Sequence, residues 1–207
     1  MTYTTLEIMQ QSKVIPVVVI NNLEDAVPLA NALVDGGLNV LEITLRTSVA
    51  IEAIKQIKIS IPNAIVGTGT VIDLNTFNAS LEANVDFIVS PGTTDELLNA
   101  VAKQSIPLLP GVNSPSEVMK LLSLGFTEMK FFPAEAAGGV NMLKSIAGPL
   151  PQVTFCPTGG INLNNANDYL ALSNVTCVGG TWMLDKQLIA EKNWNEISRL
   201  AKQASEL

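Results

Sequence analysis

The sequence predicts an α/β fold, a (β/α)8 TIM barrel with one extra N-terminal helix. Eight short runs rich in β-branched residues alternate with longer segments of helical period along the 207-residue chain. No linker-like or low-complexity segment breaks the alternation, so residues 1–207 are expected to form a single TIM-barrel domain. A doubly wound sheet is the alternative that the same alternation allows.

The eight expected strands are short, apolar runs bounded by Gly, Pro, Asn or Asp. In order, they cover residues 14–20, 39–45, 64–71, 86–92, 106–111, 127–135, 152–160 and 175–180. In a barrel the outer face of each strand packs under helices and the inner face fills the lumen. The chemistry of such a barrel lies at the carboxyl ends of the strands, where polar residues of this sequence collect.

The segments between the strands carry apolar residues three and four positions apart, which predicts helices. They cover residues 23–37, 48–61, 74–84, 94–104, 114–125, 138–148 and 162–172, and a short turn after the eighth strand leads to a final helix at 193–205. The glycine pair at 36–37 is a helix stop, and Thr94 is a candidate cap. Ser114, Pro115 and Glu117 follow the order of a cap, a first-turn proline and a capping-box acid.

Composition and charge limit the class of protein. The net charge is −7 and the pI is near 4.6, which argues against nucleic acid as a partner. The apolar runs are shorter than the ~18 residues that a membrane helix needs, and the N-terminus lacks the pattern of a secretory signal. We therefore expect a cytoplasmic protein without a nucleic-acid or membrane partner.

The sequence contains no histidine, which narrows the chemistry further. This removes the Ser-His and Cys-His nucleophile systems and the usual zinc or non-haem iron sites. A carboxylate-bound Mg²⁺ is not excluded by the count. Cys156 and Cys177 lie in different expected strands and are interpreted as small, buried apolar residues.

Lys130 is the unusual residue of the sixth expected strand, which reads GFTEMKFFPAE. Lysine is depleted in strands and is almost never fully buried without a partner. One interpretation is a structural ion pair in the core, or a side chain that reaches solvent at the strand end. The other is a desolvated, uncharged amine that forms a Schiff base with a carbonyl.

Glu42 and Arg46 raise the same question in the second expected strand, which reads LEITLRT. Their spacing places both on one face of the strand. Glu42 either forms a structural ion pair with Arg46 or Lys130, or moves protons beside the amine. In the second case Arg46 binds a carboxylate or phosphate of the substrate.

Threonines and glycines stand at the ends of three other strands. Thr68 and Thr70 are expected on one face of the third strand, although the GTGT motif alone is more typical of a tight turn. The glycine pairs of PTGGI and VGGTW follow strands seven and eight, where backbone N–H groups of barrels often bind phosphate. The candidate phosphate site consists of these two glycine pairs and the hydroxyl of Thr181.

With these motifs in order, the sequence resembles the bacterial 2-keto-3-deoxy-6-phosphogluconate (KDPG) aldolase family, also described as 4-hydroxy-2-oxoglutarate (KHG) aldolases. The motifs LEITLRT, KFFPAE and CPTGGI are specific in combination, and the resemblance covers nearly the whole chain. It implies a class I aldolase without a metal or organic cofactor, which acts on a keto-acid sugar phosphate as a homotrimer. Lys130 would be the Schiff-base lysine and Glu42 the general acid/base.

The resemblance also implies the binding residues. Arg46 and Thr70 would bind the pyruvyl carboxylate, and Pro91, Phe132 and Thr158 would line the pocket. Gly159, Gly160, Gly180 and Thr181 would hold the phosphate. Some relatives carry an arginine at the end of strand one and a serine in place of the threonine of VGGTW. Here strand one ends in VVVINN, without a cation, which leaves the preference between phosphorylated and unphosphorylated substrates open.

The implied reaction is cleavage of KDPG to pyruvate and glyceraldehyde 3-phosphate, and of KHG to pyruvate and glyoxylate. 2-Keto-3-deoxy-6-phosphogalactonate is an alternative substrate that the motifs do not separate. A different class of protein stays open from the residues alone. It is a phosphate-binding barrel, either a sugar-phosphate epimerase or a non-catalytic sensor, in which Lys130 forms no imine.

Overall fold

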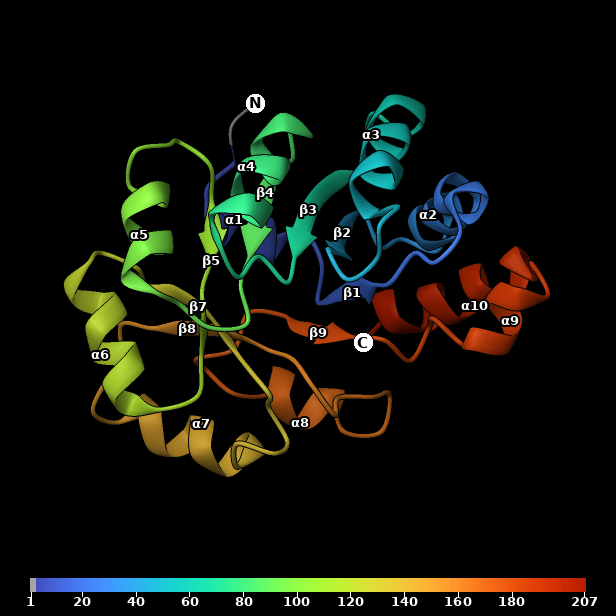
Figure 1. The fold of residues 1–207 in the computed structure, drawn as a ribbon. Coiled ribbons are helices and arrows are strands. Elements are labelled where there is room, and N and C mark those ends of the chain that lie inside the picture. Colours follow the sequence, from blue (N-terminus) through green and yellow to red (C-terminus); the bar gives the residue numbers. More distant parts are fainter. Residues whose placement is uncertain (1–2) are drawn as a thin grey trace.

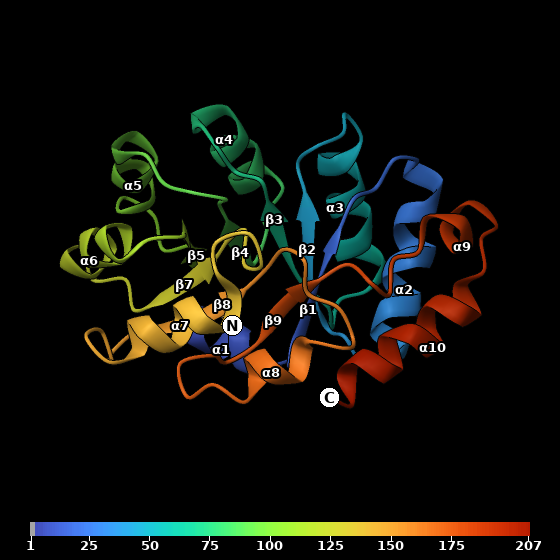
Figure 2. The ribbon, with the colours of Figure 1, turned by 90° about the horizontal axis from the view of Figure 1, so that it is seen from below.

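Short parallel strands surrounded by helices make up the computed structural model, which describes residues 3–207 (Figure 1, Figure 2). The strands are β1 (Val14–Val18), β2 (Val40–Thr44), β3 (Ile65–Gly69), β4 (Phe87–Val89), β5 (Leu108–Leu109), β6 (Gly111–Val112), β7 (Glu128–Phe131), β8 (Thr154–Pro157) and β9 (Val178–Gly180). Every strand pair among the described residues is parallel. This confirms the predicted α/β fold with parallel strands.

The helices follow the strands as the apolar periodicity predicts. They are α1 (Thr5–Gln10), α2 (Ala26–Asp35), α3 (Ala50–Ser60), α4 (Leu74–Glu82), α5 (Asp95–Val101), α6 (Pro115–Ser123), α7 (Gly139–Ala147), α8 (Ala166–Leu170), α9 (Lys186–Ala190) and α10 (Trp194–Ser205), with a 3-10 turn at Leu23–Asp25. Thr94 caps α5, and Ser114 forms a capping box with Glu117 on α6, both as predicted. None of the helices between residues 3 and 207 is long and apolar enough to cross a membrane.

Helix α9 is an element that the sequence reading missed, because it expected only a short turn after the eighth strand. The Asp185 carboxylate accepts hydrogen bonds from the backbone N–H groups of Gln187 and Leu188. This capping satisfies free donors at the start of the helix and makes five residues sufficient for it.

The strands are arranged in two sheets that adjoin at both ends. One has the order β5-β4-β3-β2-β1-β9 and the other the order β6-β7-β8. Pro110 is the single residue between β5 and β6. Proline interrupts the strand because it has no N–H to continue a ladder. The Pro110 carbonyl still accepts a hydrogen bond from the Lys130 N–H. On the other side, a parallel bridge joins Thr158 to Gly179.

Two hydrophobic clusters form the core. The larger lies between the strands and the surrounding helices. The smaller joins Ile8 and Met9 of α1 to residues at the amino ends of the strands, among them Val40, Ile65 and Phe87. Helix α1 therefore covers the amino ends of the strands and leaves their carboxyl ends for a site.

Candidate active site

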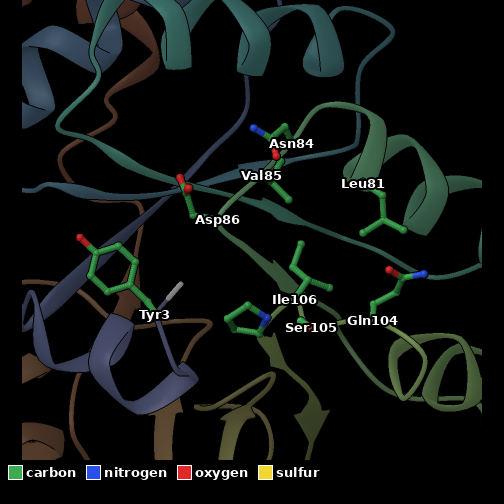
Figure 3. Close-up of a pocket in the computed structure, with 9 residues that line it drawn as sticks. Tyr3, Leu81, Asn84, Val85, Asp86, Gln104, Ser105 and Ile106 are labelled. Carbon is green, nitrogen blue, oxygen red and sulfur yellow. The ribbon is translucent and has the colours of Figure 1, made fainter. Parts of the chain in front are cut away.

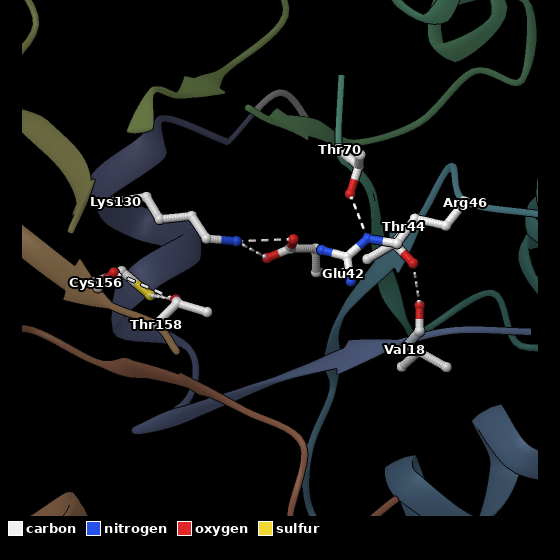
Figure 4. Close-up of polar contacts among 8 residues, drawn as sticks. All are labelled: Val18, Glu42, Thr44, Arg46, Thr70, Lys130, Cys156 and Thr158. Carbon is white, nitrogen blue, oxygen red and sulfur yellow. Dashed lines mark hydrogen bonds and ion pairs between the residues drawn. The ribbon is translucent and has the colours of Figure 1, made fainter. Parts of the chain in front are cut away.

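Lys130 and Glu42 form a buried pair between the two sheets (Figure 4). Lys130 Nζ on β7 donates to Glu42 Oε1 and Oε2 on β2, at 2.9 and 3.0 Å. The residues are only 5% and 4% exposed. Charged groups are costly to bury without a partner, and here each charge has the other as its partner. Of the alternatives for Glu42, the structure contains its pair with Lys130.

Gly69 makes room for the Glu42 carboxylate. It ends β3 and pairs with Thr44 on β2. A Cβ atom at position 69 would lie 2.3 Å from Glu42 Oε1 and 2.7 Å from Glu42 Cγ, closer than real Cβ contacts allow. Any other residue at this position would displace the carboxylate or the strand. The second glycine of GTGT thus allows the close approach of the Glu42 side chain.

Phe132 lies beside the amine, as the alternation of strand side chains predicts. The Lys130 Nζ atom is 5.6 Å from the centroid of the Phe132 ring. This distance is within the range of a cation–π contact, which stabilises the charged amine in a site with little water. The aromatic ring therefore completes an environment with one carboxylate and one π face.

Arg46 and Thr70 contact each other at the carboxyl ends of β2 and β3 (Figure 4). Arg46 Nε donates to Thr70 Oγ1 at 3.0 Å. The expectation that Thr68 and Thr70 share one face is wrong. Thr68 instead donates to Ser80 Oγ on α4, at 2.9 Å. Thr70 follows β3 with φ of 62°, in the left-handed region, and this turn ends the alternation of the strand.

Most of the predicted site residues line one cavity of about 210 Å³ at the carboxyl ends of the strands. These are Arg46, Lys130, Phe132, Thr158, Gly159, Gly160, Gly180 and Thr181. Glu42 and Thr70 reach this cavity through their contacts with Lys130 and Arg46. Pro91 lies after β4, where its carbonyl carbon is 2.3 Å from the position of a Cβ at Gly111. The structure thus places Pro91 against the backbone of β6 rather than on the wall of the cavity.

Three further wall residues are absent from the set that the resemblance implies: Val17, Ile161 and Gly179. A Cβ at Gly179 would lie 2.2 Å from Thr158 Oγ1, so the glycine admits the threonine side chain. Its place in VGGTW was a usable signal, whereas Val17 and Ile161 read as ordinary apolar residues.

The candidate phosphate loop turns sharply at two glycines. Gly159 and Gly160 have φ of 105° and 80°, which glycine adopts without strain. A Cβ at Gly160 would lie 2.6 Å from Glu135 Cγ. The Glu135 carboxylate accepts a hydrogen bond from the Tyr169 hydroxyl. Burial, and then this hydrogen bond, raise the pKa of Tyr169, so the hydroxyl stays a donor at neutral pH.

The two cysteines are buried and unbonded, as predicted. The hydrogen bond with Cys156 and burial raise the pKa of the Cys177 thiol well above its usual value. Cys156 Sγ lies 4.0 Å from Thr158 Oγ1, next to the cavity (Figure 4). The raised pKa makes the Cys177 thiol a poor nucleophile, and Lys130 is the nucleophile candidate that lines the cavity.

Comparisons with known proteins agree with this geometry. The model of the KDPG and KHG aldolase family matches residues 6–200. The KHG/KDPG aldolase of Escherichia coli K12 is 48% identical over 199 residues, which cover 96% of this chain and 93% of the relative.

Two solved structures extend the comparison. The KDPG aldolase of Legionella pneumophila, with pyruvate captured as a covalent carbinolamine intermediate, is 50% identical, has a TM-score of 0.94 and is covered over 97% of both chains. The KDPG aldolase of Zymomonas mobilis ZM4 with 3-phosphoglycerate is 47% identical and has a TM-score of 0.88. The match covers 96% of this chain and 93% of the Zymomonas chain. Motifs, fold and comparisons therefore lead to one conclusion: the chain belongs to the KDPG and KHG aldolase family.

Proposed function

We propose that the chain is a class I aldolase that cleaves KDPG to pyruvate and glyceraldehyde 3-phosphate. The observation that carries the proposal is the contact of Lys130 Nζ with both carboxylate oxygens of Glu42, at 2.9 and 3.0 Å, beside a cavity. An amine forms an imine only when it is uncharged, and a bonded carboxylate can take and return the proton. The covalent pyruvate in the Legionella relative supports the same chemistry.

Imine formation uses the pair in both directions. The Lys130 ammonium passes a proton to Glu42, and the free amine attacks the C2 keto carbon of the substrate. The resulting carbinolamine loses its hydroxyl as water, with the proton supplied by Glu42. The product is a protonated imine that draws electrons from the neighbouring carbon atoms.

Cleavage of the C3–C4 bond follows. The Glu42 carboxylate removes the proton of the C4 hydroxyl, the C3–C4 electron pair moves toward the imine, and glyceraldehyde 3-phosphate leaves. The remaining enamine takes a proton at C3, and water hydrolyses the imine to release pyruvate and the Lys130 amine. With KHG, the same steps release glyoxylate as the aldehyde.

Substrate binding is assigned to the polar residues around the pair. Arg46, held by Thr70, binds the carboxylate next to the keto group, because a guanidinium matches a carboxylate in shape and charge. Phe132 and Thr158 line the reacting centre. Gly159, Gly160, Gly180 and Thr181 offer backbone N–H groups and one hydroxyl to the phosphate. Pro91 acts indirectly, because its backbone carbonyl packs against Gly111 of β6.

Borohydride reduction in the presence of pyruvate tests the function. We expect a stable pyruvyl adduct on Lys130, located by peptide mass spectrometry. The absence of an adduct, with pyruvate at saturating concentration, would contradict the imine mechanism and favour an epimerase or a sensor. Values of kcat/KM for KDPG, KHG and the galactonate-derived isomer would then rank the substrates, with KDPG expected first.

The architecture and the oligomeric state of the chain are proposed as well. We propose that the two sheets close into one (β/α)8 barrel in a single domain, with α1 as the extra N-terminal helix. The single residue between β5 and β6 and the bridge from Thr158 to Gly179 support this closure. The homotrimer and the cytoplasmic location stay predictions. Light scattering checks the trimer, for which a mass three times the 22.0 kDa chain is expected.

A further inference from the structure

A second cavity adjoins the catalytic one and has no role in the mechanism above. It has a volume of about 540 Å³, and both cavities have Val17, Arg46 and Thr181 on their walls. The catalytic cavity, at about 210 Å³, is smaller than the ~300–1,000 Å³ of typical ligand sites. A ligand group bound at Thr181 therefore faces both cavities.

The chemistry of the second cavity suits an anion. Its polar wall residues are Arg46, Thr181, Asn21 and Lys186, and the others are apolar. No carboxylate from the described residues lines it. The neighbouring acid, Asp185, is occupied as the cap of α9. Lys186 is exposed and forms no ion pair with any residue between 3 and 207, so its charge is free for a ligand.

Three cations line the two cavities, and two of them have other roles in the proposed mechanism. The catalytic cavity contains Lys130, which reacts with the keto carbon, and Arg46, which is assigned to the carboxylate. The glycine loops offer only neutral donors to the phosphate. A phosphate ester carries up to two negative charges at neutral pH, and charge-assisted hydrogen bonds are the strong ones. Lys186 is the remaining cation on the walls of the two cavities.

We propose that Lys186 is a specificity-determining residue, whose ammonium group binds the distal phosphate at Thr181 from the side of the second cavity. The inference rests on the proposed aldolase function and adds to it the selection of phosphorylated, six-carbon keto acids. KHG is a five-carbon diacid and brings no phosphate to Thr181. Lys186 therefore separates the two substrates.

Steady-state kinetics of Lys186→Ala with both substrates test the inference. We expect KM for KDPG to rise roughly five- to tenfold with little change in kcat, as for the loss of one partly exposed ionic contact. KM for KHG stays within about twofold, because KHG has no phosphate for Lys186 to bind. Lys186→Arg keeps the charge and restores most of the KDPG affinity.

Lys55→Ala is the matched control, since Lys55 is an exposed lysine of α3 that lines neither cavity. The inference is overturned if Lys186→Ala behaves as Lys55→Ala with KDPG, or if it weakens KHG equally. Trapping of pyruvate on Lys130 distinguishes a failure of the Lys186 inference from a failure of the proposed aldolase function. A variant that forms the adduct but shows no KDPG effect overturns only this inference, whereas a wild-type chain without the adduct overturns the proposed function as well.

Discussion

Among residues 3–207, two lysine–carboxylate pairs are buried or half-buried, and only one belongs to the candidate active site. Lys130 contacts Glu42 beside the cavity at the carboxyl ends, with side chains 6% and 5% exposed. Lys58 contacts Asp86 at the amino end of β4, at 2.7 Å, with side chains 20% and 29% exposed. Asp86 lies on a cavity of about 450 Å³ together with Tyr3 and Ile106 (Figure 3).

The difference lies in the partners of each carboxylate. Asp86 accepts a hydrogen bond from the backbone N–H of Val66 at 2.8 Å as well as one from Lys58, so it links β3 to α3. Glu42 has Lys130 as its only hydrogen-bond partner within the described chain. A carboxylate fixed by the backbone stabilises the fold, whereas one bonded only to an amine can exchange a proton with it. Cavity volume does not separate the two regions, since the amino-end cavity is larger than the catalytic one.

Removal of the two lysines gives the largest contrast. We expect Lys130→Ala to lower kcat by roughly 10⁵-fold or more, because the covalent path is lost. Lys58→Ala should keep kcat within about twofold, since it contacts no part of the cavity. Single-turnover assays and circular dichroism of both variants measure activity and fold. Near-normal turnover of Lys130→Ala would show that the assignment is wrong.

Neutralising the two carboxylates sharpens the same contrast. Glu42→Gln keeps the shape but cannot take a proton, and we expect kcat to fall by roughly 10²–10⁴-fold. Asp86→Asn should leave kcat almost unchanged. The pH profile of kcat, measured for both variants, shows whether an acid/base group has been lost. Equal profiles would contradict the division of roles between the two carboxylates.

Gly69→Ala displaces the Glu42 carboxylate without changing any polar group. The new Cβ would lie 2.3 Å from Glu42 Oε1, so the carboxylate has to move. A misplacement near 1 Å costs catalysis about 10²-fold, and we expect that loss in kcat. Gly148→Ala is the control, since open space surrounds its Cβ position. Unchanged kinetics of Gly69→Ala would show that Glu42 need not hold this position.

The smallest effect is expected on stability at the amino end. Lys58→Ala should lower the free energy of unfolding by about 1 kcal/mol or less, because the pair is partly exposed to solvent. Asp86→Asn weakens the bond to the Val66 N–H as well, and we expect about 1–2 kcal/mol. Urea unfolding of both variants measures these values. A loss above that range would show that the Lys58–Asp86 pair contributes to stability as a fully buried ion pair does.

The sequence singled out Lys130 and Glu42 as charges in apolar strands, but alternation left either Arg46 or Lys130 as the partner of Glu42, and the catalytic roles followed from the family resemblance. The inward turn of Thr70 could not be predicted, because it depends on a left-handed φ that strand periodicity does not encode. Helix α9 was missed because a five-residue helix depends on its Asp185 cap more than on periodicity. Lys186 read as an ordinary surface lysine, since only the tertiary structure brings it to Arg46 and Thr181.

The contact between Glu42 and Lys130 joins residues 88 positions apart, on two different sheets. Contacts of such sequence separation close large loops and are slow to form, because much chain entropy is lost before they stabilise the fold. A partly folded chain that has formed only one sheet has no proton exchange partner for its amine. Recovery of activity during refolding therefore reports the joining of the two sheets, and lags behind the recovery of secondary structure.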